Sequence, residues 1–203
     1  MTLAASDLSF SYPGADALFE HVDLELAAGE RVAVVAPSGR GKTTLCRILA
    51  GYLHPDSGAV LADGVDVRAR RRGPHPVQLI SQHPETILDP HVRVGRSLSE
   101  VCSDDGYRRY LQELFGIDRT WEARFVRELS GGQLMRICLV RAFSVRPRYV
   151  LADEVTAMMD AVSQAEIWRA MLELQRREPF GMVLVSHSPA LVRRVATRVH
   201  ELS

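Results

Sequence analysis

Hydrophobic and polar residues follow two different spacings along the chain, and each spacing predicts one kind of element. Residues 3–10 and 18–26 alternate with period two, most clearly where Val22, Leu24 and Leu26 are separated by acidic residues, which predicts half-buried strands. Short unbroken apolar runs predict strands covered on both faces, at 31–36, 77–81, 149–152 and 182–186. Apolar residues at helical spacing predict helices near 43–50, 134–145, 167–174 and 190–196.

The order of these elements predicts the fold class. Strands that alternate with helices are typical of an α/β protein with a mostly parallel sheet, to which the N-terminal strands add an antiparallel β subdomain. The segment 83–127 differs, because it has no strand pattern and only two or three short helical patterns. We therefore expect one domain over 1–203, with a core at 1–82 and 128–203 and an inserted helical subdomain at 83–127.

The composition excludes several classes of protein. The 25 basic and 25 acidic side chains cancel, which argues against binding nucleic acid or anionic membranes through bulk charge. A basic run, Arg68 with residues 70–72, has no interleaved aromatic residues and predicts a solvated loop. No apolar run approaches the roughly 18 residues of a membrane helix, and the N-terminus lacks the pattern of a signal peptide. We expect a soluble, cytosolic protein whose three distant cysteines are buried thiols.

A loop with the features of a phosphate-binding site lies at 36–43, between a predicted strand and a predicted helix. Its glycines let backbone N–H groups surround phosphate oxygens, and the N-terminus of the helix adds a favourable dipole. Lys42, the only lysine of the chain, stands where an ammonium group reaches the β- and γ-phosphates, and Thr43 where a hydroxyl binds Mg²⁺. Ala36 replaces the first glycine of the pattern, which adds one methyl group at the entry to the loop. The nucleotide-binding residues predicted in this loop and directly after it are Ser38, Gly39, Arg40, Gly41, Lys42, Thr43 and Thr44.

Two adjacent carboxylates, Asp153 and Glu154, follow the apolar strand predicted at 149–152. One acid can hold Mg²⁺ while its neighbour polarises an attacking water. Many strands end in an acidic residue, so the acidic pair alone is a weak indication of a site. Together with the phosphate-binding loop it is a strong one, because the carboxyl ends of parallel strands can lie side by side.

The sequence Leu-Ser-Gly-Gly-Gln at 129–133 directly precedes a predicted amphipathic helix. Ser130 is a favourable N-cap residue and the two glycines let backbone amides approach an anion, although an ordinary capped helix start has the same features. Taken with the loop at 36–43, the acids at 153–154 and His187 after a predicted strand, the motif resembles the ATP-binding subunit of an ABC transporter in order and spacing over nearly the whole chain. The resemblance implies a P-loop NTPase fold with ATP and Mg²⁺ as its ligands.

The resemblance also implies roles for single residues. Tyr12 corresponds to the aromatic residue that stacks on adenine, although a simple strand-end tyrosine is the alternative. The implied catalytic residues are Glu154 as general base, His187 as the histidine that contacts the γ-phosphate and orients the water, and Gln82 as the link to the helical subdomain. A structural histidine is the alternative for His187, and Val155 stands where the family has proline. The implied Mg²⁺ ligands are Thr43, Gln82 and Asp153. The residues implied to contact ATP in the opposite subunit are Ser130, Gly131, Gly132, Gln133 and Asp160.

A narrower resemblance concerns the cargo. Residues 82–90, 94–95, 153–164 and 167–168 are similar to segments of ATP-binding subunits that drive import of short peptides and nickel. Members of that group often carry a C-terminal extension, so we expect this chain to be a minimal version. The histidines at 75, 83 and 91 invite a metal-site interpretation, but their eight-residue spacing gives no common face on a helix or strand.

The resemblance implies a set of partners. These are a second ATP-binding subunit, identical or different, membrane-spanning permease subunits contacted through 82–95, and indirectly an external solute-binding protein, but no nucleic acid. The expected location is the cytoplasmic face of the cell membrane, through the permease. An export ATPase, a soluble ABC-type ATPase of assembly or repair, and a nucleotide-binding module without hydrolysis are the alternatives.

Overall fold

The computed structural model describes residues 1–69 and 72–202 and divides into two compact units. Unit 1 comprises Met1–Leu79, Pro147–Glu154 and the chain from Glu178 onward, and unit 2 comprises Ile80–Arg146 and Val155–Arg177. Two residues of the predicted basic run, Arg70 and Arg71, lie outside the described residues.

Unit 1 contains an antiparallel sheet built from the N-terminal part of the chain. Its strand order is β2-β1-β4-β5, and the pairs β1–β2, β1–β4 and β4–β5 are all antiparallel. This confirms the predicted antiparallel subdomain. The strands are β1 (Thr2–Ser11), β2 (Ala17–Ala27), β4 (Ser57–Ala62) and β5 (Val65–Asp66).

A second sheet has the order β6-β7-β8-β3-β9, and its pairs β7–β8, β8–β3 and β3–β9 are parallel. The strands β7 and β8 are buried along their whole length, as their unbroken apolar sequences predict. The sheet consists of β3 (Arg31–Val35), β6 (Val77–Ile80), β7 (Tyr149–Asp153), β8 (Gly181–Val185) and β9 (Arg198–Glu201). Because β3, β7 and β8 are mutually parallel, their carboxyl ends share one edge of the sheet.

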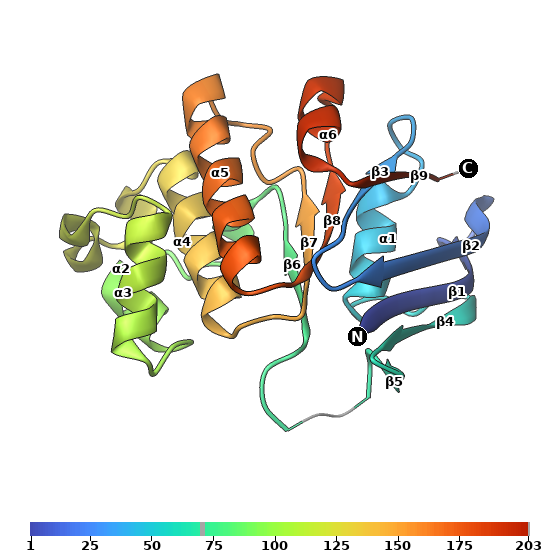
Figure 1. Cartoon of the computed structure of the whole chain (residues 1–203), viewed down its shortest axis with the longest axis horizontal. Helices are drawn as coiled ribbons and strands as arrows, with labels where there is room; N and C mark the ends of the chain where they lie inside the picture. The colour runs from blue at the N-terminus through green and yellow to red at the C-terminus, as the bar shows by residue number, and fades with distance from the viewer. Residues whose placement is uncertain (70–71, 203) are drawn as a thin grey trace. The chain divides into compact units, whose positions relative to one another are not determined.

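The core of unit 1 joins both sheets through helix α1 (Lys42–Leu49). Leu45, Cys46, Ile48 and Leu49 of α1 belong to one hydrophobic cluster with buried side chains from β1, β2, β3, β7 and β8. Figure 1 labels α1 and the strands of both sheets. A short helix, α6 (Pro189–Val195), leads from β8 to β9. The helix that begins at Lys42 is therefore held in place by the apolar faces of two sheets.

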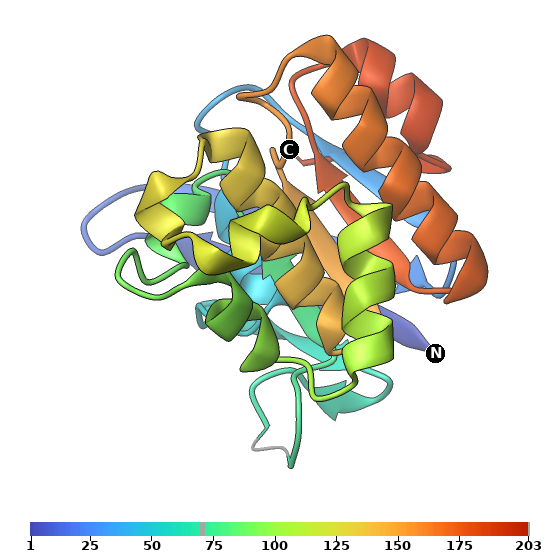
Figure 2. The same cartoon turned by 90° about the vertical axis from the view of Figure 1, so that its left-hand side faces the viewer.

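Unit 2 is helical and contains the whole of the 83–127 segment together with two longer helices. Its helices are α2 (Val94–Ser99), α3 (Asp105–Leu114), α4 (Gly131–Ser144) and α5 (Ala161–Arg177), with 3₁₀ turns at Pro84–Thr86, Arg119–Ala123 and Val126–Glu128. The helices α2 and α3 both pack on α4 (Figure 2), and the rings of Phe115 and Phe143 stack with centroids 5.6 Å apart. The boundary of a separate subdomain at 83–127 stays a prediction.

The three cysteines are free and buried, as predicted. Burial raises the pKa of the Cys46 thiol well above its usual value and that of Cys138 to about 12, so both thiols stay protonated. Among the described residues, no helix is long and apolar enough to cross a membrane.

The histidines at 75, 83 and 91 each have a local partner. Both ring nitrogens of His75 contact backbone carbonyl oxygens, of Val77 and Val67, at 2.8 and 2.7 Å. His83 pairs with Glu85, and His91 contacts Arg127. In the described parts of the chain, no group of three or more metal-ligating side chains is present.

Candidate active site

The loop between β3 and α1 requires glycine at its last position. Gly39 and Gly41 have φ angles of 79° and 82°, in the left-handed region that favours glycine. At Gly41 a Cβ atom would also lie 2.8 Å from Cγ of Leu18, inside van der Waals contact. The amide of Leu45 donates to the Gly41 carbonyl at 2.7 Å, so the first turn of α1 starts directly behind this glycine. The backbone can therefore turn its N–H groups toward an anion at this point.

Lys42 lies across its own loop. Its Nζ donates hydrogen bonds to the carbonyl oxygens of Ala36 at 2.9 Å and Pro37 at 3.0 Å, and its side chain is buried. The ammonium group is thus held at the loop, where phosphate oxygens can replace the two carbonyls as acceptors. Ala36, the departure from the usual glycine, contributes its carbonyl to this contact.

Tyr12, the predicted adenine partner, lies beside the start of α1. Its hydroxyl is 3.0 Å from Oγ1 of Thr44, and its ring packs edge-on against Phe10 with centroids 5.0 Å apart. The residue is exposed, so the free face of the ring is accessible to a flat heterocycle. Both features suit the predicted role, which stays a prediction.

Asp153, at the end of β7, carries a buried carboxylate group. Its residue is 4% exposed, and Oδ1 is buried without a hydrogen-bond partner. Burial raises the pKa of this carboxyl group, whereas a hydrogen bond with the Thr43 side chain opposes that rise. An unpartnered buried carboxylate oxygen beside a threonine hydroxyl is a donor set that suits Mg²⁺, so the two residues fit the predicted metal.

Glu154 has an unusual backbone conformation. Its φ angle is 53°, in the left-handed region, which costs a non-glycine residue about 1–3 kcal/mol. Its amide donates to the Val185 carbonyl at 3.1 Å, and its Oε1 lies 2.7 Å from Nε2 of His187. The structure therefore brings together the predicted base and the predicted histidine, from the ends of neighbouring strands.

Two serines beside His187 were not among the predicted site residues. The amide of Ser188 donates to Oγ of Ser186 at 3.1 Å, and Oγ of Ser188 accepts from the Leu191 amide at 3.3 Å as the N-cap of α6. These contacts fix the backbone on the C-terminal side of His187. The pattern Ser-Pro after the histidine is an N-cap pattern from which the role of Ser188 could have been found.

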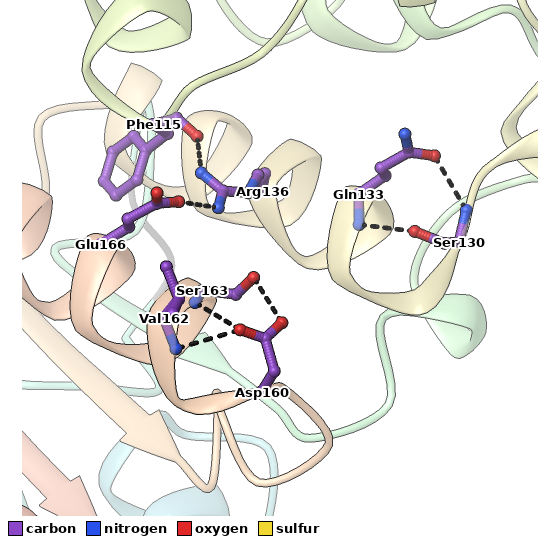
Figure 3. Close-up of polar contacts among 8 residues, drawn as sticks. All are labelled: Phe115, Ser130, Gln133, Arg136, Asp160, Val162, Ser163 and Glu166. Atoms are coloured by element: carbon purple, nitrogen blue, oxygen red, sulfur yellow. Dashed lines mark hydrogen bonds and ion pairs between the residues drawn. The ribbon is translucent and has the colours of Figure 1, made fainter.

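In unit 2, the residues of the Leu-Ser-Gly-Gly-Gln motif form a capping box at the start of α4 (Figure 3). Oγ of Ser130 accepts from the Gln133 amide at 3.4 Å, and the Gln133 side chain accepts from the Ser130 amide at 3.0 Å. The Ser130 hydroxyl can still donate its proton, and amides in the first turn of a helix have no acceptor within it. A hydroxyl and the amides of Gly131 and Gly132 are therefore available to an anion at this helix start.

Asp160 caps helix α5 (Figure 3). Its Oδ1 accepts from the amides of Val162 and Ser163 at 3.0 and 2.9 Å, and its Oδ2 accepts from Oγ of Ser163 at 2.7 Å. These hydrogen bonds, above all the one from the Ser163 amide, lower the pKa of the carboxyl group. Asp160 therefore caps α5, whereas its predicted role at the opposite ATP site stays a prediction.

The predicted permease-contact segment, residues 82–95, also lies in unit 2. Ile87 is 49% exposed, whereas Leu88 is 4% exposed and belongs to the interior of that unit. Gln82 is partly exposed after β6, and because Thr43 and Asp153 are in unit 1, its link to them stays a prediction.

The sequence profile of the ABC transporter family matches residues 19–157, which include the phosphate-binding loop, the Leu-Ser-Gly-Gly-Gln motif and the acidic pair. The chain belongs to the ABC transporter family. The ATP-binding subunits of this family are similar to the chain in both sequence and fold.

A di/tripeptide transport ATP-binding protein of Pseudomonas aeruginosa is 33% identical, over 97% of this chain and 68% of the relative. A probable peptide ABC transporter ATP-binding protein of Sinorhizobium fredii is 31% identical over 89% of this chain, and an Fe(3+) ions import ATP-binding protein of Serratia marcescens is 36% identical over 98%. The chain spans only 55% and 59% of the length of these last two relatives.

Among solved structures, an ATP-binding subunit of an ABC transporter superposes with a TM-score of 0.86 at 22% identity, covering 100% of this chain and 86% of that structure. A putative ABC transporter ATP-binding protein from Pyrococcus furiosus gives a TM-score of 0.83 at 20% identity, covering 100% and 98%. These likenesses confirm the predicted fold class, an α/β P-loop NTPase.

Burial raises the pKa of Asp153, so we expect the folded protein to become more stable when the charge of this residue is removed. A raised pKa means that the folded protein binds the proton more tightly than the unfolded chain does, so stability falls as the pH rises from the ordinary Asp range through the raised value. Asp153→Asn should therefore unfold at a higher temperature than the wild type at neutral pH without nucleotide, and the difference should vanish in acid.

Asp118→Asn is the matched control, because hydrogen bonds from Thr120 lower the pKa of that exposed carboxyl group. It should give no gain at neutral pH. A lower melting temperature for Asp153→Asn than for the wild type at neutral pH would contradict the account of this site.

Proposed function

We propose that this chain is the ATP-hydrolysing subunit of an ABC-type importer. The observation that carries the proposal is the contact of 2.7 Å between Glu154 and His187, directly after the buried Asp153 and in the same unit as the phosphate-binding loop. A nucleotide-binding module without hydrolysis has no need for a carboxylate held in a strained backbone conformation. The membership in the ABC transporter family supports the same conclusion.

The nucleotide would be bound by unit 1. The amides of residues 38–44 and the Lys42 ammonium hold the phosphates, and the ring of Tyr12 stacks on adenine. Thr43 and Asp153 would hold Mg²⁺, which when bound neutralises charge on the phosphate oxygens, and Gln82 would complete its ligands.

Glu154 acts as general base in this mechanism. Its carboxylate accepts a proton from the attacking water, and the Nε2 contact with His187 fixes the orientation of the carboxylate. Only one of its two oxygens, Oε1, is needed for that contact. The exposed His187 can then contact the γ-phosphate and orient the water.

The ATP site would be completed by a second ATP-binding subunit, identical or different. The hydroxyl of Ser130, the amides of Gly131 and Gly132, and Gln133 would contact the γ-phosphate bound by the partner. Asp160 would lie at the same interface. The capping box supports this role, because it orients the start of α4 without using the Ser130 proton.

The proposed cargo is a small solute, and a short peptide is the first candidate. Five of the similar relatives are named for peptide or di/tripeptide transport or import, and a sixth for glutathione import. The relatives named for Fe(3+) import support a metal ion or metal chelate as the second candidate, whereas none of the relatives described above is named for nickel.

Import also implies the other partners. Permease subunits would bind residues 82–95 and place the chain at the cytoplasmic face of the membrane, and an external binding protein would deliver the solute. The relatives named for import favour this function over export and over a soluble ATPase of assembly or repair.

Glu154→Gln should separate ATP binding from hydrolysis. The amide is nearly isosteric but cannot accept the water proton, so turnover should fall by about 10²-fold or more. ATP binding should remain, because Lys42, Thr43 and Asp153 are unchanged. Light scattering after size-exclusion chromatography should show a dimer with ATP and a monomer with ADP, with the second subunit added if the pair is heteromeric.

Glu113→Gln on the exposed face of α3 is the matched control and should keep wild-type turnover. Wild-type turnover in Glu154→Gln would exclude Glu154 as the base. Absence of ATP hydrolysis in the wild-type dimer would overturn the proposed function itself.

Ile87→Ser should uncouple the ATPase from transport. The side chain is 49% exposed in the predicted permease-contact segment, so its removal should leave the turnover of the isolated subunit within about twofold of wild type. Co-purification with the permease, and solute uptake by the complex, should both fall.

Tyr52→Ser is the control, because it removes another large exposed side chain, in unit 1. It should affect neither assay. An equal loss of ATPase activity and transport in Ile87→Ser would mean that this segment supports the fold or the site instead.

A further inference from the structure

One arginine of α4 contacts two other helical segments of unit 2. Nη1 of Arg136 donates a hydrogen bond to the carbonyl oxygen of Phe115, directly after α3, at 2.7 Å, and its Nη2 lies 2.6 Å from Oε2 of Glu166 in α5 (Figure 3). The Arg136 side chain is 15% exposed, so both contacts are largely enclosed by protein. A Cβ atom at Gly116 would lie 2.8 Å from Nη1, so the glycine leaves the space that the guanidinium group occupies. The planar group thus binds in two directions at once.

The ion pair lies at the same distance from the start of each of its two helices. Arg136 follows Ser130, the N-cap of α4, by six residues. Glu166 follows Asp160, whose carboxylate caps α5, by six residues as well. The two helices therefore run from their caps to a shared contact over equal lengths of chain.

The starts of the two helices also touch. A Cβ atom at Gly132 would lie 3.9 Å from Cε of Met159, the residue before Asp160, which is an ordinary van der Waals contact. Gly132 and Arg136 are four residues apart, which corresponds to about 6 Å along a helix. Contacts at two heights prevent α4 from sliding or tilting against α5, so they fix the register of the two helices. All of these residues belong to unit 2.

We propose that the ion pair of Arg136 and Glu166 positions the starts of α4 and α5 relative to each other, so that both meet the partner subunit together. The proposal rests on the function proposed above, in which Ser130 and Asp160 face that partner. A role in stability alone does not explain the pair, because Glu166 is 52% exposed and such ion pairs contribute little to the free energy of unfolding. Geometry matters more, since a misplacement of about 1 Å at a reacting site can cost roughly 10²-fold.

Glu166→Ala tests the proposal, because it removes the carboxylate and leaves the bond from Arg136 to Phe115 in place. In the Glu154→Gln background this change should weaken ATP-dependent dimer formation by about tenfold or more, measured by light scattering over a range of protein concentrations, with the second subunit present if the pair is heteromeric. The ATP affinity of the monomer should stay within about twofold, and the melting temperature without nucleotide should change little. Glu166→Gln, which keeps an oxygen acceptor for Nη2, should restore part of the dimer affinity.

Glu173→Ala is the matched control, because Glu173 forms an ion pair of 2.7 Å with Arg177 in the same helix, α5. It should leave dimer formation unchanged. Arg136→Gln should also weaken the dimer, and its loss should add little to that of Glu166→Ala in the double variant. Wild-type dimer affinity in Glu166→Ala, fully additive losses, or an equal loss in the control would each overturn the proposal. Absence of an ATP-dependent dimer in Glu154→Gln alone would instead overturn the proposed function.

Discussion

The register of three parallel strands determines where the chemistry of unit 1 takes place. Val185, the last residue of β8, is in register with Val34 on one side and with Asp153 on the other, and its carbonyl accepts the Glu154 amide. The phosphate-binding loop begins two residues after Val34, and His187 follows two residues after Val185. A shift of one residue in the pairing of β8 with β3, or of β8 with β7, would turn the site residues to the other face of the sheet. The register of the buried strands therefore specifies the site as well as the core.

The site stores unfavourable free energy that the rest of unit 1 must offset. A carboxylate at 153 is buried beside a second carboxylate at 154, and the second one has a strained backbone. Such features lower stability but suit a site that binds a cation and a polyanion, because the ligands supply the missing partners. The large shared core around α1 provides the opposing stabilisation.

Local patterns in the sequence predict much of this structure. The glycines of the loop, the apolar runs of the strands and the N-cap of α4 were predictable because each depends on neighbouring residues. Other features depend on contacts between distant segments and could not be predicted. The left-handed conformation of Glu154 follows from its place beside Val185, and the burial of Leu88 follows from packing in unit 2.

We propose that Glu154 and His187 act as one catalytic pair. The most direct test is a double-mutant cycle on ATP turnover, with Glu154→Gln, His187→Ala and the double variant measured at saturating ATP. We predict that each single variant loses most of the turnover and that the double variant loses no more than Glu154→Gln alone. Losses that add independently in the double variant would contradict the claim and indicate two separate contributions.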